Sequence, residues 1–233
     1  MKIKNIQPLT LIDYPGILAC TIFIFGCNFR CGFCYNSGLV LKEDTPDMEH
    51  DKVLEFLQKR RKYLDGVCFT GGEPLMSLDI GFLREVKALG YKIKIDTNGS
   101  FPEKLRHLIE LNLVDFVSMD IKSSKEKYSE LTNVKPNMEK IEESIELISK
   151  LSEYEFRTTI LEDIHTEEEI KKIAEWLNRI AEKKPKKFVL QGFKVQGKII
   201  DSQFNNYKDT TEECLKKLKK EIETYFEEIE IRV

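Results

Sequence analysis

The feature that most constrains the fold is a repeated alternation of short apolar runs with amphipathic stretches. Runs typical of β-strands begin near residues 20, 66, 91, 115, 155 and 188, and a helical pattern follows each of them. This alternation predicts a parallel sheet covered by helices. Six such units are fewer than the eight of a closed barrel, so we predict an α/β fold with a partial, open (βα)6 barrel of the TIM type.

The length of 233 residues favours a single domain, residues 1–233, with three parts. Residues 1–18 carry two short apolar stretches around a Pro-Gly turn at positions 15 and 16, which predicts a short N-terminal hairpin. Residues 19–193 hold the six βα units. Residues 194–233 are expected to form a C-terminal extension with a last helix and a short strand.

Composition excludes several classes of protein. Hydrophobic residues make up 41% of the chain and charged residues 33%, as in ordinary globular proteins. The net charge of −3 gives no basic field for nucleic acid. Apolar runs stay far below the roughly 20 residues of a membrane span, and the N-terminus lacks the apolar core of a signal peptide. We therefore expect a cytoplasmic protein that binds neither nucleic acid nor membrane.

Three of the six cysteines fall within eight residues, with the spacing C-x3-C-x2-C: Cys27, Cys31 and Cys34. They follow the apolar run 21–25, which ends at Gly26, so they should lie on a loop at the carboxyl end of a strand. Thiolates this close together bind soft metals, chiefly zinc or iron–sulfur clusters.

The number of thiols separates these alternatives. A structural zinc site needs four ligands, and the three histidines are distant in sequence. A [4Fe-4S] cluster on three cysteines leaves one iron open for a substrate or cofactor. We favour the cluster over zinc and over ordinary buried thiols. The other cysteines stand singly and predict no disulfide framework: Cys20, Cys68 and Cys214.

The pattern C-x3-C-x-aromatic-C after a first strand resembles the signature of the radical S-adenosylmethionine (SAM) enzymes. The resemblance implies that Cys27, Cys31 and Cys34 hold a [4Fe-4S] cluster. It also implies that the open iron takes the amino and carboxylate groups of SAM, and that Phe33 lies near the adenine. The partial barrel is the fold of this family. Tyr35, which follows the third cysteine, is also expected to bind the cofactor.

A second motif, Gly71-Gly72-Glu73-Pro74, follows the predicted strand that begins at residue 66. By residue type alone it is a tight turn, because glycine permits unusual backbone angles and proline fixes φ. Behind the cysteines it resembles the GGEP motif of the same family. The resemblance implies that this segment binds the methionyl amino group through its backbone and Glu73.

Polar residues end three further predicted strands: Asp96 and Asn98 in the turn Asp96-Thr97-Asn98-Gly99, Lys122 in Asp120-Ile121-Lys122, and Arg157. Solvated strand ends or a salt bridge would also explain them. They resemble the activating enzymes of glycyl radical proteins. That resemblance implies that Asp96 contacts the ribose, that Lys122 meets the methionyl carboxylate, and that Arg157 faces the cofactor.

All these segments lie past the carboxyl ends of strands, where active sites form in parallel α/β folds. As a further hypothesis, Asp96 and Asp120 hold a monovalent cation.

The resemblance implies reductive cleavage of SAM to a 5′-deoxyadenosyl radical, which takes a hydrogen atom from a glycine of a partner enzyme. It is strongest to the activating proteins of anaerobic ribonucleotide reductase, because the sequence has no additional ferredoxin-like cysteine cluster. Tyr35 departs from that group, which usually carries histidine after the third cysteine, so the partner is left open. A flavodoxin- or ferredoxin-type protein is the expected electron donor.

Two other functions compete. A radical SAM enzyme could act on a small molecule, such as a precursor of deazaguanine. An electron-transfer protein could house the cluster without SAM, but Glu73, Asp96 and Lys122 would then have no role.

Overall fold

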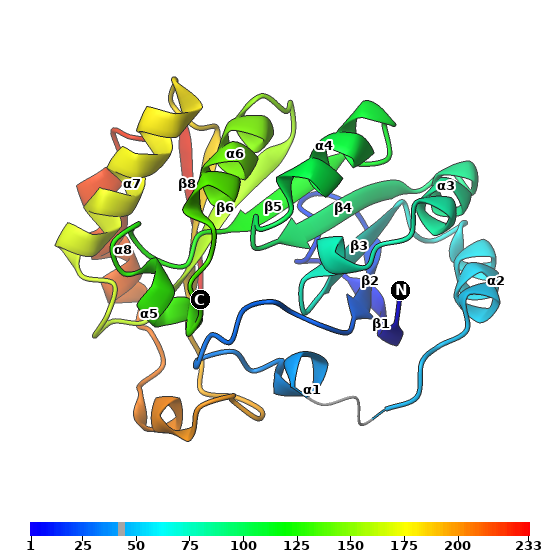
Figure 1. Cartoon of the computed structure of the whole chain (residues 1–233), viewed down its shortest axis with the longest axis horizontal. Helices are drawn as coiled ribbons and strands as arrows, with labels where there is room; N and C mark the ends of the chain where they lie inside the picture. Colours follow the sequence, from blue (N-terminus) through cyan, green and yellow to red (C-terminus); the bar gives the residue numbers. More distant parts are fainter. Residues whose placement is uncertain (42–44) are drawn as a thin grey trace. The chain divides into compact units, whose positions relative to one another are not determined.

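The computed structural model describes residues 1–41 and 45–233. Within this part of the chain, eight strands lie in one sheet in chain order, with helices between them (Figure 1). The strands are β1 (Ile3–Thr10), β2 (Ala19–Ile24), β3 (Gly66–Gly71), β4 (Lys92–Thr97), β5 (Phe116–Asp120), β6 (Tyr154–Ile160), β7 (Lys187–Gly192) and β8 (Glu228–Arg232).

The helices follow the amphipathic stretches of the sequence. Several of the helices have side-chain N-caps: for example, the side chain of Asn137 accepts from the backbone N–H of Glu139 and Lys140, and that of Thr166 accepts from Glu169 N–H. The helices are α1 (Ser37–Val40), α2 (His50–Arg60), α3 (Ile80–Ala88), α4 (Pro102–Glu110), α5 (Tyr128–Thr132), α6 (Met138–Ser149), α7 (Glu167–Ala181) and α8 (Glu212–Ile222), with 3-10 helices η1 (Pro74–Met76) and η2 (Ser202–Asn206).

Most strand pairs run parallel, as the alternation of elements predicts. Strand β2 pairs in parallel with β3, and β3 with β4. Likewise, β6 pairs in parallel with β7, and β7 with β8. The order is linear from β1 to β8, so the sheet is not closed. The predicted α/β class and open barrel are confirmed.

The N-terminal hairpin differs from the expectation that both arms lie within residues 1–18. Strand β1 is the first arm, and it pairs antiparallel with β2, from Ile3 opposite Ile24 to Thr10 opposite Ala19. Gly16 takes a positive φ of 70° in the turn between them. The second apolar stretch is therefore part of the turn, because β2 itself satisfies the backbone groups of β1.

The C-terminal extension also joins the sheet. Strand β8 pairs with β7, from Lys187 opposite Glu228 to Gln191 opposite Arg232. The parallel series thus extends one strand beyond the six that were predicted. The segment 36–48 contains the short helix α1, and its residues 42–44 lie outside the described part.

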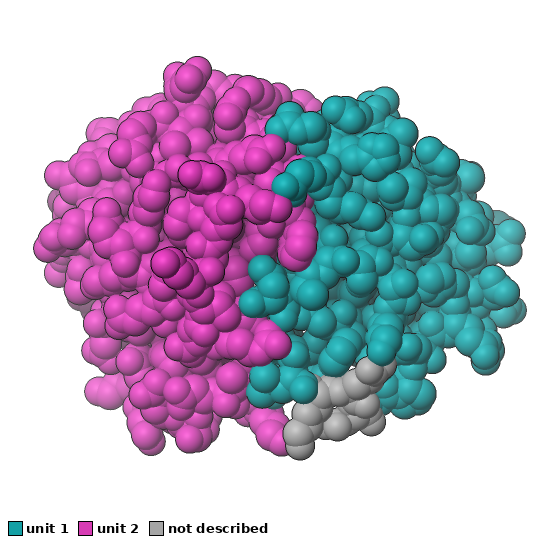
Figure 2. Space-filling view, in the orientation of Figure 1, with its two compact units in different colours: residues 1–28, 36–97, 103–117 teal, residues 29–35, 98–102, 118–233 magenta. Residues whose placement is uncertain are grey.

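The chain divides into two compact units (Figure 2). The first comprises residues 1–28, 36–97 and 103–117, and the second residues 29–35, 98–102 and 118–233. In the second unit, α7 contacts both α6 and α8. No helix in the described residues is long and apolar enough to cross a membrane. Each unit has its own fully buried side chains, among them Ile22, Phe69 and Leu83 in the first and Phe156, Ile173 and Val189 in the second.

Candidate active site

The cysteine motif follows β2: Cys27 is a residue of the first unit, and Cys31 and Cys34 are residues of the second. All three thiols are free of disulfides, with Cys31 buried and the other two partly exposed. The N–H of Cys34 donates to the carbonyl of Cys31 at 3.1 Å, which turns the chain between them. Cysteine thiols are the donor set that an iron–sulfur cluster requires.

One side of the cysteine loop is held by α5. The N–H of Arg30 donates to the carbonyl of Thr132 at 2.9 Å, and the Asn133 amide donates back to the Arg30 carbonyl at 3.0 Å. The ring of Phe29 meets Tyr128 edge-on, with centroids 6.3 Å apart. These contacts fix the backbone between the first and second cysteines.

The other side is held by the C-terminal extension. The N–H of Ile200 donates to the carbonyl of Cys34 at 3.1 Å, and the N–H of Asp201 donates to the carbonyl of Gly32 at 2.9 Å. Two backbone hydrogen bonds thus join this segment to the part of the loop that carries two of the thiols. The segment from residue 194 to 209 is therefore an integral support of the loop.

Phe204 completes this support. Its ring lies so close to Gly32 that a Cβ there would stand 2.5 Å from the ring. It also meets Phe33 edge-on, with centroids 6.1 Å apart. Phe33, predicted to lie near the adenine, is 5% exposed and rests on Phe204. The small residue between the second and third cysteines is thus required by packing.

The segment Gly71-Gly72-Glu73-Pro74 leaves the end of β3 pressed against the end of β2. Gly71 has φ of 121°, and a Cβ on Gly72 would stand 2.0 Å from the carbonyl oxygen of Gly26. The N–H of Gly72 donates to the Ile24 carbonyl at 2.9 Å, and that of Glu73 to the Gly26 carbonyl at 2.7 Å. The two glycines therefore permit an approach that side chains would block.

Glu73 is fully buried, and its carboxylate is used inside the protein. Its Oε1 accepts from the N–H of Leu75 at 3.0 Å, as the N-cap of η1, and from the Thr97 hydroxyl at 2.8 Å. Pro74 occupies the first position of η1, where its missing N–H has no cost. These contacts fix the orientation of the carboxylate and link the GGEP-like segment to the end of β4.

The turn after β4 begins in the first unit and continues in the second. Asp96 is 9% exposed and pairs with the ammonium group of Lys94. The side chain of Asn98 accepts from the N–H of Ser100 at 2.9 Å, so it shapes the turn locally. Both predicted residues are therefore in ordered positions at the carboxyl end of the strand.

Asp120 at the end of β5 forms ion pairs with two cationic side chains of the second unit. Its carboxylate accepts from Arg157 Nε at 2.7 Å and from Lys122 Nζ at 3.1 Å. Burial alone would raise the pKa of Asp120, but the charges of Arg157 and Lys122 hold it well below its usual range. Burial would likewise lower the pKa of Lys122, but Asp120 and Cys31 raise it. All three side chains are thus charged at neutral pH.

Tyr35 is near this group of charges. Partial burial raises the pKa of its hydroxyl, while the nearby Arg157 opposes that shift and Asp120 adds to it. The phenol is therefore neutral at physiological pH and can donate a hydrogen bond. The structure brings Tyr35 close to Lys122 and Arg157, two of the residues predicted to face the cofactor.

Two residues that were not predicted to belong to the site fix the segment after β5. Leu161 N–H donates to Nδ1 of the buried His165 at 3.1 Å, so the proton is on Nε2, which donates to the Lys122 carbonyl at 3.0 Å. Burial lowers the pKa of His165 and keeps it neutral. Glu169 accepts from the N–H of Ser124 at 2.8 Å. A lone buried histidine or helix glutamate gives no sequence signal for such a role.

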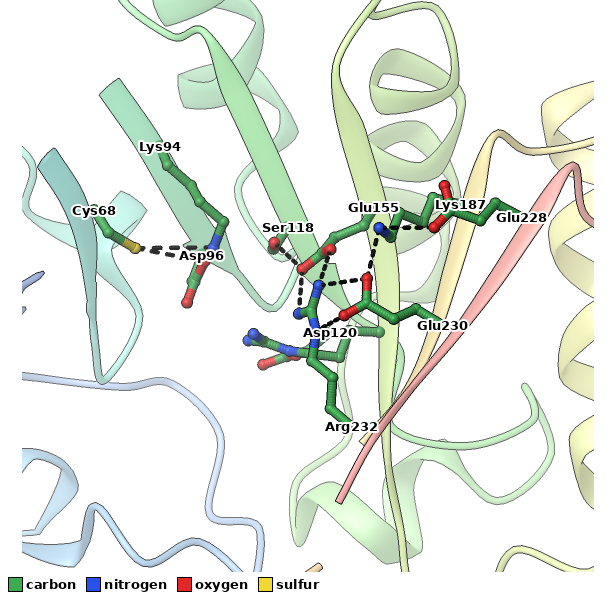
Figure 3. A network of polar contacts seen from close by, with 11 residues as sticks. Cys68, Lys94, Asp96, Ser118, Asp120, Glu155, Lys187, Glu228, Glu230 and Arg232 are labelled. Carbon is green, nitrogen blue, oxygen red and sulfur yellow. Dashed lines mark hydrogen bonds and ion pairs between the residues drawn. The ribbon is translucent and has the colours of Figure 1, made fainter. Parts of the chain in front are cut away.

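A buried polar network within the second unit also escaped sequence reasoning (Figure 3). Glu155 on β6 is fully buried, and its carboxylate accepts from both Nη atoms of Arg232 at 3.0 and 2.7 Å and from the Ser118 hydroxyl at 2.7 Å. Arg232 on β8 also pairs with Glu230, which pairs with Lys187. This network links β8 to β6 across β7.

Comparison with known proteins supports the reading of the motifs. Residues 21–192 match the family model described as the radical SAM superfamily. Over 240 residues the chain is 30% identical to a protein of Methanocaldococcus jannaschii named "putative glycyl-radical enzyme activating enzyme", covering 99% of this chain and 95% of that protein.

Two further relatives match over shorter stretches. The pyruvate formate-lyase-activating enzyme of Listeria monocytogenes is 31% identical over 145 residues, 56% of this chain and 57% of that protein. The anaerobic ribonucleoside-triphosphate reductase-activating protein of Salmonella typhimurium is 32% identical over 79 residues, 32% of this chain and 50% of that protein.

Among solved structures, a domain of pyruvate-formate lyase-activating enzyme from Bacteroides vulgatus has a TM-score of 0.55 at 21% identity. The match covers 72% of this chain and 99% of that domain. This likeness supports the fold.

Proposed function

The chain belongs to the radical SAM superfamily, and on that premise we propose that it installs a glycyl radical on a partner enzyme, an anaerobic ribonucleotide reductase. The observation that carries the activating function is the similarity over 99% of the chain to a protein named as a glycyl-radical enzyme activating enzyme. The family implies a [4Fe-4S] cluster and SAM. When bound, these groups supply an electron and, from SAM, a 5′-deoxyadenosyl radical.

The three clustered cysteines are proposed as the protein ligands of the cluster. None of them forms a disulfide, and the loop that carries two of them is held by backbone hydrogen bonds from two sides. Hydrogen bonds to the backbone of the loop restrict its conformations, which lowers the ordering cost of binding.

The GGEP-like segment and the charged strand ends are proposed to bind SAM. The backbone from Gly71 to Pro74 and the fixed carboxylate of Glu73 would take the methionyl amino group. Lys122 has three donors, so it can keep Asp120 and still donate to the methionyl carboxylate. Arg157 would add charge on the same side, and Asp96 and Asn98 would border the ribose.

The choice of anaerobic ribonucleotide reductase rests on two observations. The Salmonella typhimurium relative has that name, and the sequence carries no additional ferredoxin-like cysteine cluster. Pyruvate formate-lyase is the competing partner, because the Listeria monocytogenes relative is named as its activating enzyme. A flavodoxin- or ferredoxin-type protein is the proposed electron donor.

The decisive experiment follows the hydrogen atom. The anaerobically reconstituted, reduced protein should be mixed with SAM and a candidate partner whose glycines carry deuterium. A glycine-centred radical should appear by electron paramagnetic resonance, and deuterium should appear in 5′-deoxyadenosine. A partner with its radical glycine replaced by alanine is the control and should give neither signal.

The outcome also separates the competing functions. If the radical formed on pyruvate formate-lyase and not on the ribonucleotide reductase, pyruvate formate-lyase would be the partner. Deuterium arriving only from a small molecule of a cell extract would overturn the activating function. If the reduced protein did not cleave SAM, the result would favour a function in electron transfer.

A further inference from the structure

A buried ammonium group lies on the strand that leads to Asp96. The side chain of Lys94 is 1% exposed, and its Nζ forms an ion pair with Oδ1 of Asp96 (Figure 3). Cys68, opposite Lys94 in the register of β3 and β4, has its Sγ 3.8 Å from Nζ and 3.8 Å from Asp96 Oδ1. The centroid of the Phe116 ring lies 5.9 Å from Nζ.

This arrangement needs a reason, because burying an ammonium is costly. Lysine is almost never fully buried unless its charge is compensated, and the compensation rarely exceeds the cost of removing both charges from water. An apolar side chain of similar length would fill the same space in the sheet without that cost. The useful property of Lys94 is therefore its charge beside Asp96.

The same charge bears on the hypothesis that Asp96 and Asp120 hold a monovalent cation. Each of the two carboxylates is ion-paired within its own unit. Lys94 meets Asp96, while Arg157 and Lys122 meet Asp120 at 2.7 and 3.1 Å. The negative charge of each carboxylate is thus already compensated by cations that are tethered to the chain, so no net negative charge is left to attract an ion from solution. These residues therefore do not fit a bound monovalent cation.

We propose that Lys94 is a built-in counter-ion: its ammonium group takes the place of a soluble monovalent cation and fixes the carboxylate of Asp96. Lys94 is a positioning residue, since it acts through Asp96. The claim that Lys94 takes the place of a soluble cation does not depend on the proposed function. The consequence for SAM rests on the proposed function, in which Asp96 borders the ribose.

The first test uses the full chain without cluster or cofactor. Thermal unfolding is followed in potassium, sodium and tetramethylammonium chloride at equal ionic strength. Lys94→Ala opens space for a small ion, whereas Lys94→Met removes the charge and keeps the space filled. Lys92→Ala changes an exposed lysine on the same strand and is the matched control.

For the wild-type chain, for Lys94→Met and for Lys92→Ala, we expect that the Tm of each protein does not change between the three salts. Lys94→Ala should melt about 5 °C higher in saturating potassium or sodium than in tetramethylammonium, because an ion that binds only the folded state raises its stability. A wild-type Tm that rises specifically with potassium or sodium would overturn the proposal. So would a Lys94→Ala protein without any salt preference.

The second test uses the reconstituted holoprotein and measures SAM affinity by anaerobic calorimetry. Wild-type affinity should be independent of the salt. Lys94→Ala should lose about tenfold in tetramethylammonium, the effect of one charge-assisted contact, and recover in potassium, whereas Lys94→Met should stay weak in every salt. If Lys94→Ala lost SAM affinity and no salt restored it, the proposal that Lys94 replaces a soluble cation would be contradicted.

The two tests fail separately. If the wild-type holoprotein did not bind SAM, the proposed function would be wrong, while the melting data would still decide the role of Lys94. If Lys94→Ala did not fold, the wild-type salt series would decide, because a built-in counter-ion requires that series to be flat.

Discussion

Replacing Gly72 with alanine should damage both the fold and cofactor binding. The new Cβ would stand 2.0 Å from the carbonyl oxygen of Gly26 and 2.5 Å from its carbonyl carbon. Backbone atoms cannot yield as the end of a flexible side chain can. The GGEP-like segment and the end of β2 must therefore separate.

The cost follows from what that separation breaks. Two hydrogen bonds join the segments, from Gly72 N–H to Ile24 at 2.9 Å and from Glu73 N–H to Gly26 at 2.7 Å. Losing one buried hydrogen bond costs about 1–3 kcal/mol. Strain from an added methyl group in a packed site adds about 1–3 kcal/mol. We expect the free energy of unfolding to fall by about 2–6 kcal/mol.

The assay is anaerobic urea denaturation of the cofactor-free chain, followed by circular dichroism. The midpoint should fall with little change in the m-value, because the loss is in stability rather than in the surface exposed. Gly38→Ala is the control: Gly38 lies in α1, and its Cβ would have no heavy atom within 4 Å. That variant should equal or exceed the wild type, by up to about 1 kcal/mol.

The same variant links the fold to the proposed cofactor site. Moving the segment would displace Glu73, so the reconstituted Gly72→Ala protein should bind SAM more weakly, whereas Gly38→Ala should bind it normally. A Gly72→Ala protein with wild-type midpoint and wild-type SAM affinity would refute the claim that the close approach is required.

Two further predictions concern metal content and pH. Anaerobic reconstitution should give about four irons per chain, and stoichiometric zinc without iron absorption would exclude the cluster. Alanine at Cys27, Cys31 or Cys34 should abolish iron binding, while alanine at Cys20, Cys68 or Cys214 should not. Arg232→Met should cost about 3–5 kcal/mol at pH 7, because the Glu155 carboxylate would stay buried without its cation. Burial raises the pKa of Glu155, but Arg232 outweighs it and holds the pKa below the ordinary value for a glutamate. The pair therefore stabilises the fold fully above that ordinary value, about 4.3, and loses this effect as the pH falls through the lowered pKa, so urea midpoints of the two proteins should converge in acid; an equal difference at every pH would contradict this account.

The strands that carry the site could be located from the sequence because their signals are local. The runs before Gly26 and Gly71 are rich in β-branched and aromatic residues and end in glycine, and β2 and β3 end near those positions. The requirement for glycine in the GGEP-like segment also agrees with the backbone, since Gly71 has a positive φ. A local pattern is sufficient where the cause is local.

Pairing and partner choice depended on distant residues and were missed. The second arm of the N-terminal hairpin could not be identified, because the pairing of β1 with β2 depends on the register between the two strands. Thr166 and Glu169 have the spacing of a capping box, yet only Thr166 caps, because the Glu169 carboxylate accepts from Ser124 N–H, 45 positions away in the chain. Such a competition is invisible within a window of a few residues.

Lys94 was hidden for a different reason. The run Lys92-Ile93-Lys94-Ile95 alternates as a half-exposed strand would, which places both lysines on the solvent face. Lys92 is exposed, but Lys94 is buried, because the next residue on the same face is Asp96 and the neighbouring strand contributes Cys68. Alternation identifies two faces of a strand, but it does not say whether the polar face meets water or a polar interior.

The proposed cofactor site therefore has polar groups that are positioned before any ligand binds. Glu73 accepts from Leu75 and Thr97, and Lys94 pairs with Asp96. Such preorganisation avoids the entropy of ordering side chains on binding, and it fixes the charges that meet the ligand. It follows that residues behind the site should matter for SAM affinity almost as much as those that touch the cofactor. Removing Thr97 or Lys94 frees a carboxylate to turn, even though neither residue is proposed to contact SAM.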